Sequence, residues 1–499
     1  MKAHLMYRDE DFNLNQPLPP NEADLVHDLD LDTLLGAMAN GDEFLLRVSR
    51  TALLAGLNGP DAIVYRQQVL ADCMANHEVV RQIYDLVVKA VADVRRHFWF
   101  ASNNSPSHLM YQSPQIIEMF VGFLKQLYTI ADKQSADFTS QGWTTLFTVL
   151  KNELDAEYFS VIEEQLQQLK FKEGTLISAQ LGPANNGVNY VLRDPRHTKQ
   201  TWKERLGVGG RKSFSFEIPP RDEAGSQALA DILNRGDNLA ANALAQAADH
   251  ISDFFTMLRT ELAFYVGCLN LHEHLVRKGE PTCIARAEDW SPAVLSFTGL
   301  YDVCLSLRNE QRVTGNDATA DGRSLIIVTG ANSGGKSTFL RSLGLAHLMM
   351  RSGMFVAAES FSASVGEALF THFGREEDST MTSGKLDEEL ARMDTIVSSL
   401  KARSVVLFNE SFSATNEREG SEIARQVVRA FLDADIRVAF VTHLYDFAES
   451  FFLSDSATTL FLQAGRQADS VRNYKLISGE PLSTSYGEDV YNRIGGWFE

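Results

Sequence analysis

The feature that most restricts the fold is a glycine-rich loop, Gly330-Ala331-Asn332-Ser333-Gly334-Gly335-Lys336-Ser337, which matches the phosphate-loop pattern in full. An apolar run at residues 325–328 precedes it, and from Thr338 onward apolar residues recur at helical spacing. A strand, a tight turn and a helix in this order place backbone N–H groups and a helix N-terminus around a phosphate. We therefore predict a nucleotide site in an α/β domain. The alternative, a chance glycine-rich turn, is disfavoured by this flanking pattern.

The residue types in the loop suit a nucleoside triphosphate and a divalent cation. Lys336 reaches the β- and γ-phosphate oxygens, and Ser337 ligates Mg²⁺. We expect ATP and Mg²⁺ as cofactors. The other predicted nucleotide contacts in this stretch are Gly330, Ala331, Asn332, Ser333, Gly334, Gly335 and Thr338.

Polar residues also follow two later apolar runs. The run at 405–408 ends in Asn409 and Glu410, and the run at 438–442 ends in His443. Glu410 suits general-base or water-orienting work, and His443 stands at the strand end where open α/β sheets bind ligands. Asn409 occupies the position where an aspartate that helps to place Mg²⁺ usually stands. Its amide oxygen can hold a Mg²⁺-bound water but brings no charge, so we expect weaker metal binding or slower turnover. A solvated strand-end glutamate and a structural histidine are the alternatives.

Periodicity and composition divide the chain into four expected segments. We predict a multidomain protein with a mainly α-helical core and lever over 1–173, a small β-containing insertion over 174–225, a long returning helix over 226–289 and an α/β phosphate-loop domain over 290–499.

Finer patterns predict individual elements. Helical spacing begins at Leu31, and residues 61–98 are expected to form one long helix, followed by helices at about 114–133 and 143–170. Gly-Pro-Ala-Asn-Asn-Gly between two β-rich runs predicts a hairpin within 175–192, and SFSFEI predicts a further short strand.

Charge and cysteine content restrict the partners and the compartment. Forty-six basic against 65 acidic residues give a net charge of −19, which repels nucleic acid and anionic membranes unless a local basic surface intervenes. The four cysteines are far apart and form no CxxC pair, which argues against a zinc ribbon or a disulfide framework. The N-terminus lacks an apolar signal region and no run approaches the roughly 18 apolar residues of a membrane span. We expect a cytoplasmic protein without a membrane partner.

Together these motifs resemble the ATPase domain of the MutS family of DNA mismatch-repair proteins, most strongly over residues 300–450. The resemblance lies in TGANSGGKSTFLRSLGLAHLMMRSGMFVAAES, NESFSATNEREG and VTHLYDFAE, and more weakly in two upstream stretches, DLDTLLGAMANGDEFLLRVSRTALLAGLNGPDAIVYRQQVL and FFTMLRTELAFYVGCLNLHEHL. It implies an ABC-type ATPase domain, a helical core with a lever and a clamp, and a homodimer with two nucleotides between its subunits.

The resemblance also implies roles for individual residues. Glu410 matches the catalytic carboxylate and His443 the switch histidine. Ser383 matches, loosely, the signature serine that reaches the partner's γ-phosphate, because Lys385 and Leu386 replace the aromatic residue and methionine that follow it in the family. The remaining matches are Thr415 and Asn416 in the dimer-facing loop, Asn316 and Asp317 in a pair near the nucleotide, and Glu359 near an acidic position after the loop.

A local basic segment follows the predicted hairpin, where the family places its clamp. Residues 193–212 hold seven basic side chains against only Asp194 and Glu204. Contacts from them to DNA phosphates would be independent of sequence and sensitive to salt. The alternative is a solvated basic loop that pairs with the acidic body. The seven residues are Arg193, Arg196, Lys199, Lys203, Arg205, Arg211 and Lys212.

The leading hypothesis is a MutS-like ATPase that couples ATP-driven dimer closure to the binding of mismatched or branched DNA in repair or recombination. Core-like sequence begins within about 30 residues of the start, so we expect no mismatch-reading module. One alternative is a nucleotide-gated scaffold that binds proteins and does not act on DNA. A second alternative is a protein that binds DNA and uses ATP as a slow switch with little turnover, because Asn409 stands in the place of an acidic residue.

Overall fold

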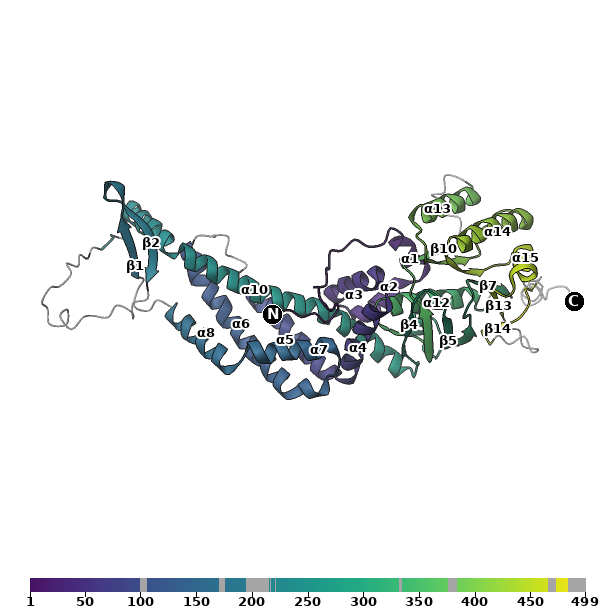
Figure 1. Ribbon diagram of the computed structural model, residues 1–499, viewed down its shortest axis with the longest axis horizontal. Helices are drawn as coiled ribbons and strands as arrows, with labels where there is room; N and C mark the ends of the chain where they lie inside the picture. The colour runs from purple at the N-terminus through teal and green to yellow at the C-terminus, as the bar shows by residue number, and fades with distance from the viewer. Residues whose placement is uncertain are drawn as a thin grey trace, which may run out of the picture. The chain divides into compact units, whose positions relative to one another are not determined.

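The computed structural model describes residues 1–98, 106–169, 176–193, 215, 217–219, 221–331, 334–375, 384–464 and 473–482 (Figure 1). The chain forms two compact units. The first comprises Met1–Ala3, Arg81–Phe138 and Trp143–Arg259, and the second comprises His4–Val80, Thr139–Gly142 and Thr260–Glu499. This division differs from the four expected segments, because residues 4–80 group with the α/β part of the chain and not with the helices that follow them.

The first unit is built mainly from helices whose aromatic side chains pack together. Phe120 stacks on Phe255 with ring centroids 5.1 Å apart, and Trp143 and Phe147 lie 5.2 Å apart. A hairpin of β1 (Leu176–Leu181) and β2 (Gly187–Arg193) confirms the predicted strand, turn and strand. The helices that lie wholly or partly in this unit are α5 (His77–Phe98), α6 (Pro106–Gln134), α7 (Gln141–Glu153), α8 (Ala156–Gln168) and α10 (Glu223–Arg277).

Two predicted helices are each broken by a polar residue. The expected single helix over 61–98 is wrong, because α4 (Pro60–Ala75) ends at Asn76, whose side-chain amide donates to Asp72 O at 3.1 Å. The expected helix over 143–170 is also two helices, since Asp155 caps α8 by accepting from Tyr158 N at 2.7 Å. Side chains of this kind compete with the helical hydrogen bonds and end the helix locally. Three of the six residues of the predicted strand SFSFEI, at positions 213, 214 and 216, lie outside the described residues, and the described Ser215, Glu217 and Ile218 are not in a strand.

The second unit contains a six-stranded sheet in the order β10-β11-β12-β7-β13-β14, parallel except for β14. Its central strands are apolar and buried on both faces, as a parallel sheet between helices requires. In chain order the strands are β7 (Leu325–Gly330), β10 (Leu369–Phe373), β11 (Val405–Asn409), β12 (Arg437–Val441), β13 (Thr459–Ala464) and β14 (Leu476–Ser478).

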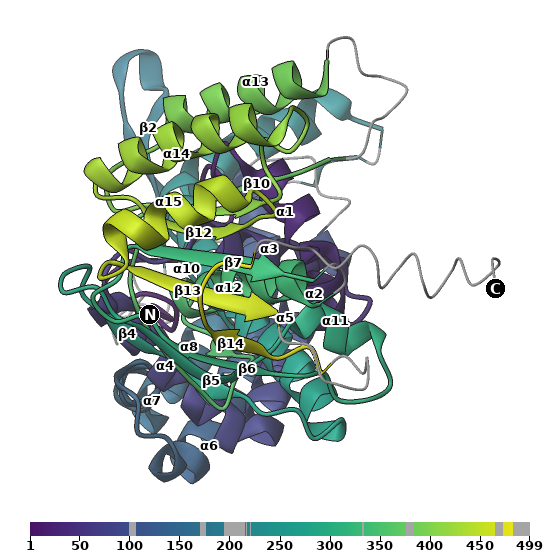
Figure 2. The same cartoon turned by 90° about the vertical axis from the view of Figure 1, so that its right-hand side faces the viewer.

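Helices cover this sheet and carry one continuous core. Phe408 and Phe440 of the sheet stack at 4.8 Å and share a cluster with Met393, Phe431 and Phe447. These last three residues belong to helices that lie together in Figure 2, namely α13 (Lys385–Ser399), α14 (Glu417–Asp433) and α15 (Tyr445–Asp455). The helix α12 (Lys336–Arg351) follows β7 directly, as predicted.

Shorter elements complete the second unit. A four-stranded sheet has the order β4-β9-β5-β6, and β3 pairs with β8. The strands are β3 (Cys283–Ile284), β4 (Arg286–Glu288), β5 (Leu295–Leu300), β6 (Asn316–Thr319), β8 (Phe355–Val356) and β9 (Ser360–Ser364). The helices are α1 (Glu22–Asp28), α2 (Leu31–Ala39), α3 (Glu43–Ala55) and α11 (Val303–Arg308). None of the helices in the described ranges has the length and apolar character that crossing a membrane requires.

A buried carboxylate ties the N-terminal segment to α10 within the second unit. Glu261 is 0% exposed and accepts hydrogen bonds from Leu5 N at 2.6 Å and Phe12 N at 3.2 Å. Tyr265 Oη donates to Leu5 O beside it. Burial raises the pKa of Glu261 from 4.5 to about 7, although the backbone N–H groups oppose this shift. The N-terminal segment therefore contributes buried residues, among them Leu5 and Phe12.

We predict that Glu261→Gln changes how stability depends on pH. The pKa of Glu261 is about 7 in the folded protein and 4.5 in the unfolded chain. Between pH 4.5 and 7 the folded protein therefore binds more protons than the unfolded chain. The contribution of Glu261 to stability consequently falls as pH rises through this range. The variant lacks this loss. Its unfolding free energy relative to wild type should therefore rise by about 3 kcal/mol from pH 4.5 to 7.5. Denaturation over this range measures it, with the exposed Glu78→Gln as control, and a constant difference contradicts it.

Candidate functional site

The predicted site residues meet at one edge of the six-stranded sheet. Asn409 of β11 pairs with Val441 of β12, and Val441 in turn pairs with Val328 of β7. Because these strands are parallel, the residues after each strand lie at the same edge. The structure therefore brings the phosphate loop, Glu410 and His443 together.

The loop between β7 and α12 requires glycine at more than one position. Gly330 and Gly335 have φ angles of +112° and +91°, which other residues rarely adopt. A Cβ at Gly334 would lie 2.7 Å from the Cβ of Ala464. Two predicted nucleotide contacts, Asn332 and Ser333, lie outside the described residues.

Lys336 opens α12 and is folded back over the loop. Its Nζ donates to Gly330 O at 2.9 Å and to Ala331 O at 3.0 Å. Burial lowers the pKa of Lys336, and the negative charge of Glu410 opposes the shift. The ammonium group is thus a buried cation beside the backbone N–H groups of the loop, where an anionic phosphate is favoured.

Ser337 and Asn409 form the predicted metal pair. Ser337 Oγ donates to Asn409 Oδ1 at 2.9 Å, so the two oxygens are neighbours. Mg²⁺ commonly takes one or two protein oxygens and completes its octahedron with water and phosphate oxygens, which fits this pair. Among the described residues, no group of three or more His, Cys, Asp and Glu side chains could hold a metal on its own.

Glu410 is oriented by His443 and by its own backbone. His443 Nε2 lies 2.9 Å from Glu410 Oε1, and Glu410 N donates to Val441 O at 2.9 Å. The hydrogen bond from His443 is the main cause that lowers the pKa of Glu410, with help from the charges of His443 and Lys336. Glu410 has φ +55°, a left-handed conformation that is strained for a residue with a side chain.

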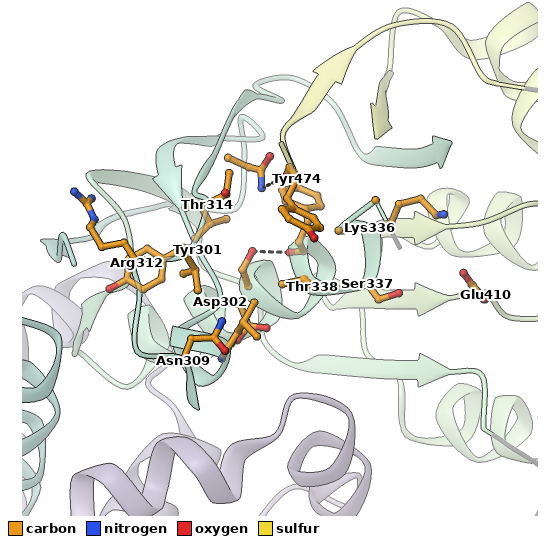
Figure 3. A pocket seen from close by; sticks show the side chains of 18 residues that line it. Tyr301, Asp302, Asn309, Arg312, Thr314, Lys336, Ser337, Thr338, Glu410 and Tyr474 are labelled. Atoms are coloured by element: carbon orange, nitrogen blue, oxygen red, sulfur yellow. Dashed lines mark hydrogen bonds between the residues drawn. The ribbon is translucent and has the colours of Figure 1, made fainter. Parts of the chain in front are cut away.

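Lys336, Ser337 and Glu410 line a cavity of about 550 Å³, a volume typical of small-molecule sites. Lys336, Ser337, Thr338 and Glu410 contribute from the strand edge, and loop residues supply the other walls (Figure 3). No sequence motif marks the loop residues, because they come from separate segments that only the fold brings together. They are Tyr301, Asp302, Asn309, Arg312, Thr314 and Tyr474.

Asn316 lines the same cavity, but its side chain already has partners. Its Oδ1 accepts from Leu476 N at 2.7 Å and its Nδ2 donates to Tyr474 O at 3.4 Å. Asp317 likewise accepts from Gly299 N at 2.7 Å and pairs with Lys475 at 3.1 Å. Both residues therefore fix the segment that carries Tyr474.

The other predicted residues lie away from this cavity or outside the described residues. Glu359 lines a smaller neighbouring cavity with Asp317. Thr415 donates to Glu419 Oε2 at 2.6 Å, and Asn416 caps α14 by accepting from Glu419 N at 3.0 Å. Arg193 donates to Ser178 Oγ at 2.9 Å across the hairpin. Outside the described residues are Ser383 and the basic residues Arg196, Lys199, Lys203, Arg205, Arg211 and Lys212.

Two family models match the chain: the MutS2 N-terminal domain over residues 58–278 and MutS domain V over residues 326–495. MutS protein homolog 4 of Homo sapiens is 24% identical over 293 residues, which cover 56% of this chain and 30% of that protein. Endonuclease MutS2 of Lacticaseibacillus paracasei is 27% identical over 349 residues, 66% of this chain and 43% of that protein. DNA mismatch repair protein MutS of Porphyromonas gingivalis is 35% identical over 132 residues, 26% of this chain and 15% of that protein. The chain spans less than half the length of these relatives.

We predict that His443→Ala raises the pKa of the Glu410 carboxyl toward its ordinary value. The variant loses the hydrogen bond and the positive charge that favour the ionised form. A ¹³C NMR titration of the glutamate carboxyl groups measures this change, with Glu410→Gln to assign the signal. His274→Ala, on α10, is the control and should leave the signal in place. An unchanged Glu410 titration in His443→Ala contradicts the prediction.

Proposed function

The chain belongs to the MutS family, and from this premise we propose that it binds and hydrolyses ATP and that its nucleotide state controls its binding of DNA in repair or recombination. The observation that carries the proposal is the meeting of three pairs of features at one edge of the sheet: the glycine loop with Lys336, Ser337 with Asn409, and Glu410 with His443. A phosphate cradle, a cation position and an oriented carboxylate are the parts that phosphoryl transfer to water needs.

Each of these side chains has a separate task in the proposed reaction. The loop N–H groups and Lys336 bind the phosphates and balance their charge. When bound, Mg²⁺ would neutralise part of the charge that develops on the phosphates. Glu410 has a lowered pKa, stays ionised at neutral pH and is a weak base, so it suits the orientation of the attacking water. His443 holds that carboxylate in place.

The loop side of the cavity offers a place for the nucleobase. Tyr474 is half exposed and borders the cavity beside Gly335, while Leu300 and Val313 add apolar surface. An aromatic ring with one free face suits stacking on a flat heterocycle. We assign Asn316 the task of fixing the segment that carries Tyr474 and not of contacting the base directly.

Asn409 makes slow turnover part of the proposal. A neutral amide in place of a carboxylate leaves the cation position with less negative charge, so the cation is held mainly by phosphate and water. A nucleotide that is bound firmly and hydrolysed slowly suits a switch between two conformations.

Dimerisation and DNA contact complete the proposal. We propose a homodimer in which Ser383, Thr415 and Asn416 face the partner's nucleotide, and a DNA contact through the basic residues of 193–212. Seven basic against two acidic side chains in that segment support the contact. The names of two relatives mention mismatch repair and an endonuclease. A nucleotide-gated protein scaffold is the second candidate, because the net charge of −19 repels DNA over most of the surface.

Purified protein should release phosphate from ATP, and its variants should separate binding from turnover. Lys336→Ala should lose ATP binding, because the buried cation of the cradle is gone. Glu410→Ala should keep ATP binding and release phosphate about 100-fold more slowly. Phosphate release and binding of a fluorescent ATP analogue measure the two effects, with Glu422→Ala on α14 as the matched control. Equal turnover in Glu410→Ala and wild type contradicts the assigned role.

Reversing charge in the basic segment tests the DNA contact. The triple variant Arg205→Glu, Arg211→Glu and Lys212→Glu should retain branched or mismatched duplex DNA at least 10-fold less well at low salt. The control Arg277→Glu, Arg286→Glu and Lys401→Glu makes the same change of net charge at exposed residues elsewhere and should retain DNA. Equal losses in both variants count against a localised contact. No retention by wild type favours the scaffold.

A further inference from the structure

The turn after Glu410 has an unfavourable backbone that other parts of the protein must hold. Glu410 and Phe412 both have left-handed backbones, with φ angles of +55° and +63°. Such conformations are costly for residues with side chains and persist only where the surroundings determine them. Ser413 Oγ donates to Glu410 O at 2.8 Å within the turn, but this contact is exposed and local. The holding contacts come from β10 and α13.

His372 of β10 holds the residue that follows Glu410. Ser411 and His372 are both 0% exposed, and Ser411 Oγ lies 2.7 Å from both Nδ1 and the carbonyl oxygen of His372. Burial lowers the pKa of His372 to about 4, so its ring is neutral and has one N–H. That N–H is on Nε2, because Nε2 lies 3.0 Å from Glu389 O, which can only accept. The Ser411 hydroxyl is then the donor to the two acceptors of His372, which are Nδ1 and the carbonyl oxygen.

Glu389 of α13 holds the second left-handed residue. Its Oε2 accepts from Phe412 N at 2.7 Å, and the residue is 3% exposed. The ring of Phe412 stacks on His372 with centroids 5.5 Å apart and an interplanar angle of 23°. Two neighbouring buried side chains therefore fix Ser411 and Phe412, the two residues that directly follow Glu410.

The same contacts join α13 to the end of β10. Glu389 O accepts from His372, and Arg392 Nη2 donates to Phe373 O at 2.7 Å, one residue further along β10. The helix α13 packs against β10 (Figure 2). A continuous set of hydrogen bonds thus runs from α13 through His372 and Glu389 to the turn that carries Glu410.

We propose that His372 and Glu389 are positioning residues that set the orientation of the Glu410 carboxylate and make it depend on the placement of α13. The proposal rests on the role of Glu410 in ATP hydrolysis argued above. Loss of either side chain lets the turn leave its left-handed conformation. Glu410 then moves from His443 and from the cavity, while the phosphate loop and ATP binding are unaffected.

Four variants separate positioning from general packing. Glu389→Ala removes the acceptor of Phe412 N, and Glu389→Gln retains an acceptor oxygen. Ser411→Ala removes only one hydroxyl and is the milder variant where Glu389→Ala does not fold. Val428→Ala is the control, because Val428 is a buried residue of the same sheet core that lies on α14 and not on α13.

We expect kcat for ATP hydrolysis to fall roughly 10- to 100-fold in Glu389→Ala, since small misplacements of a reacting group have effects of this size. Ser411→Ala should show a smaller fall, and Glu389→Gln should restore most of the rate. The Kd for a non-hydrolysable ATP analogue should stay within about twofold of wild type in all of them. Val428→Ala should lower the melting temperature and leave kcat unchanged. An unchanged kcat in Glu389→Ala, or an equal fall in Val428→Ala, overturns the proposal.

Crystal structures of wild type, Glu389→Ala and Glu389→Gln decide the same question without enzyme activity. In Glu389→Ala the 2.9 Å contact between His443 and Glu410 should be lost, and in Glu389→Gln it should remain. A contact that persists in Glu389→Ala overturns the proposal. If wild type does not hydrolyse ATP, the proposed function fails, and these structures still decide whether Glu389 positions Glu410.

Discussion

The site depends on the hydrogen-bonded register of three parallel strands. Val441 of β12 lies between Asn409 of β11 and Val328 of β7, so the residues that follow these strands reach the same edge. A shift of one residue in β11 would turn its side chains to the opposite face. The buried side chains on both faces of these strands resist such a shift, because it would exchange the side chains that pack on each face. The register therefore links the stability of the core to the geometry of the proposed chemistry.

Charge is distributed unevenly around the cavity. Lys336 is a buried cation, and Glu410 is a carboxylate whose pKa is lowered mainly by His443. The proposed cation position has the neutral oxygens of Ser337 and Asn409. In the proposed function this arrangement favours phosphate binding over rapid hydrolysis. The orientation of Glu410 then matters more, because fewer other charges assist the reaction.

Local patterns predicted the centre of the site, and long-range packing determined the rest. The phosphate loop, its strand and its helix follow from consecutive residues, and so does the hairpin of the first unit. The break at Asn76 was missed, because one side-chain hydrogen bond ended a pattern that remained periodic. Tyr474 could not be predicted, since residues far away in the sequence bring it to the cavity. The role of the Asn316 amide in holding the Tyr474 segment likewise depends on a contact between distant parts of the sequence.

The most direct test of the central claim is a crystal structure with Mg²⁺ and a non-hydrolysable ATP analogue. We predict phosphate oxygens at the N–H groups of the loop and at Lys336, a cation beside Ser337 and Asn409, and the γ-phosphate facing Glu410 and His443. The base should lie against Tyr474. A nucleotide bound elsewhere, or a cavity that stays empty at saturating analogue, would contradict the proposal that this strand edge is an ATPase site.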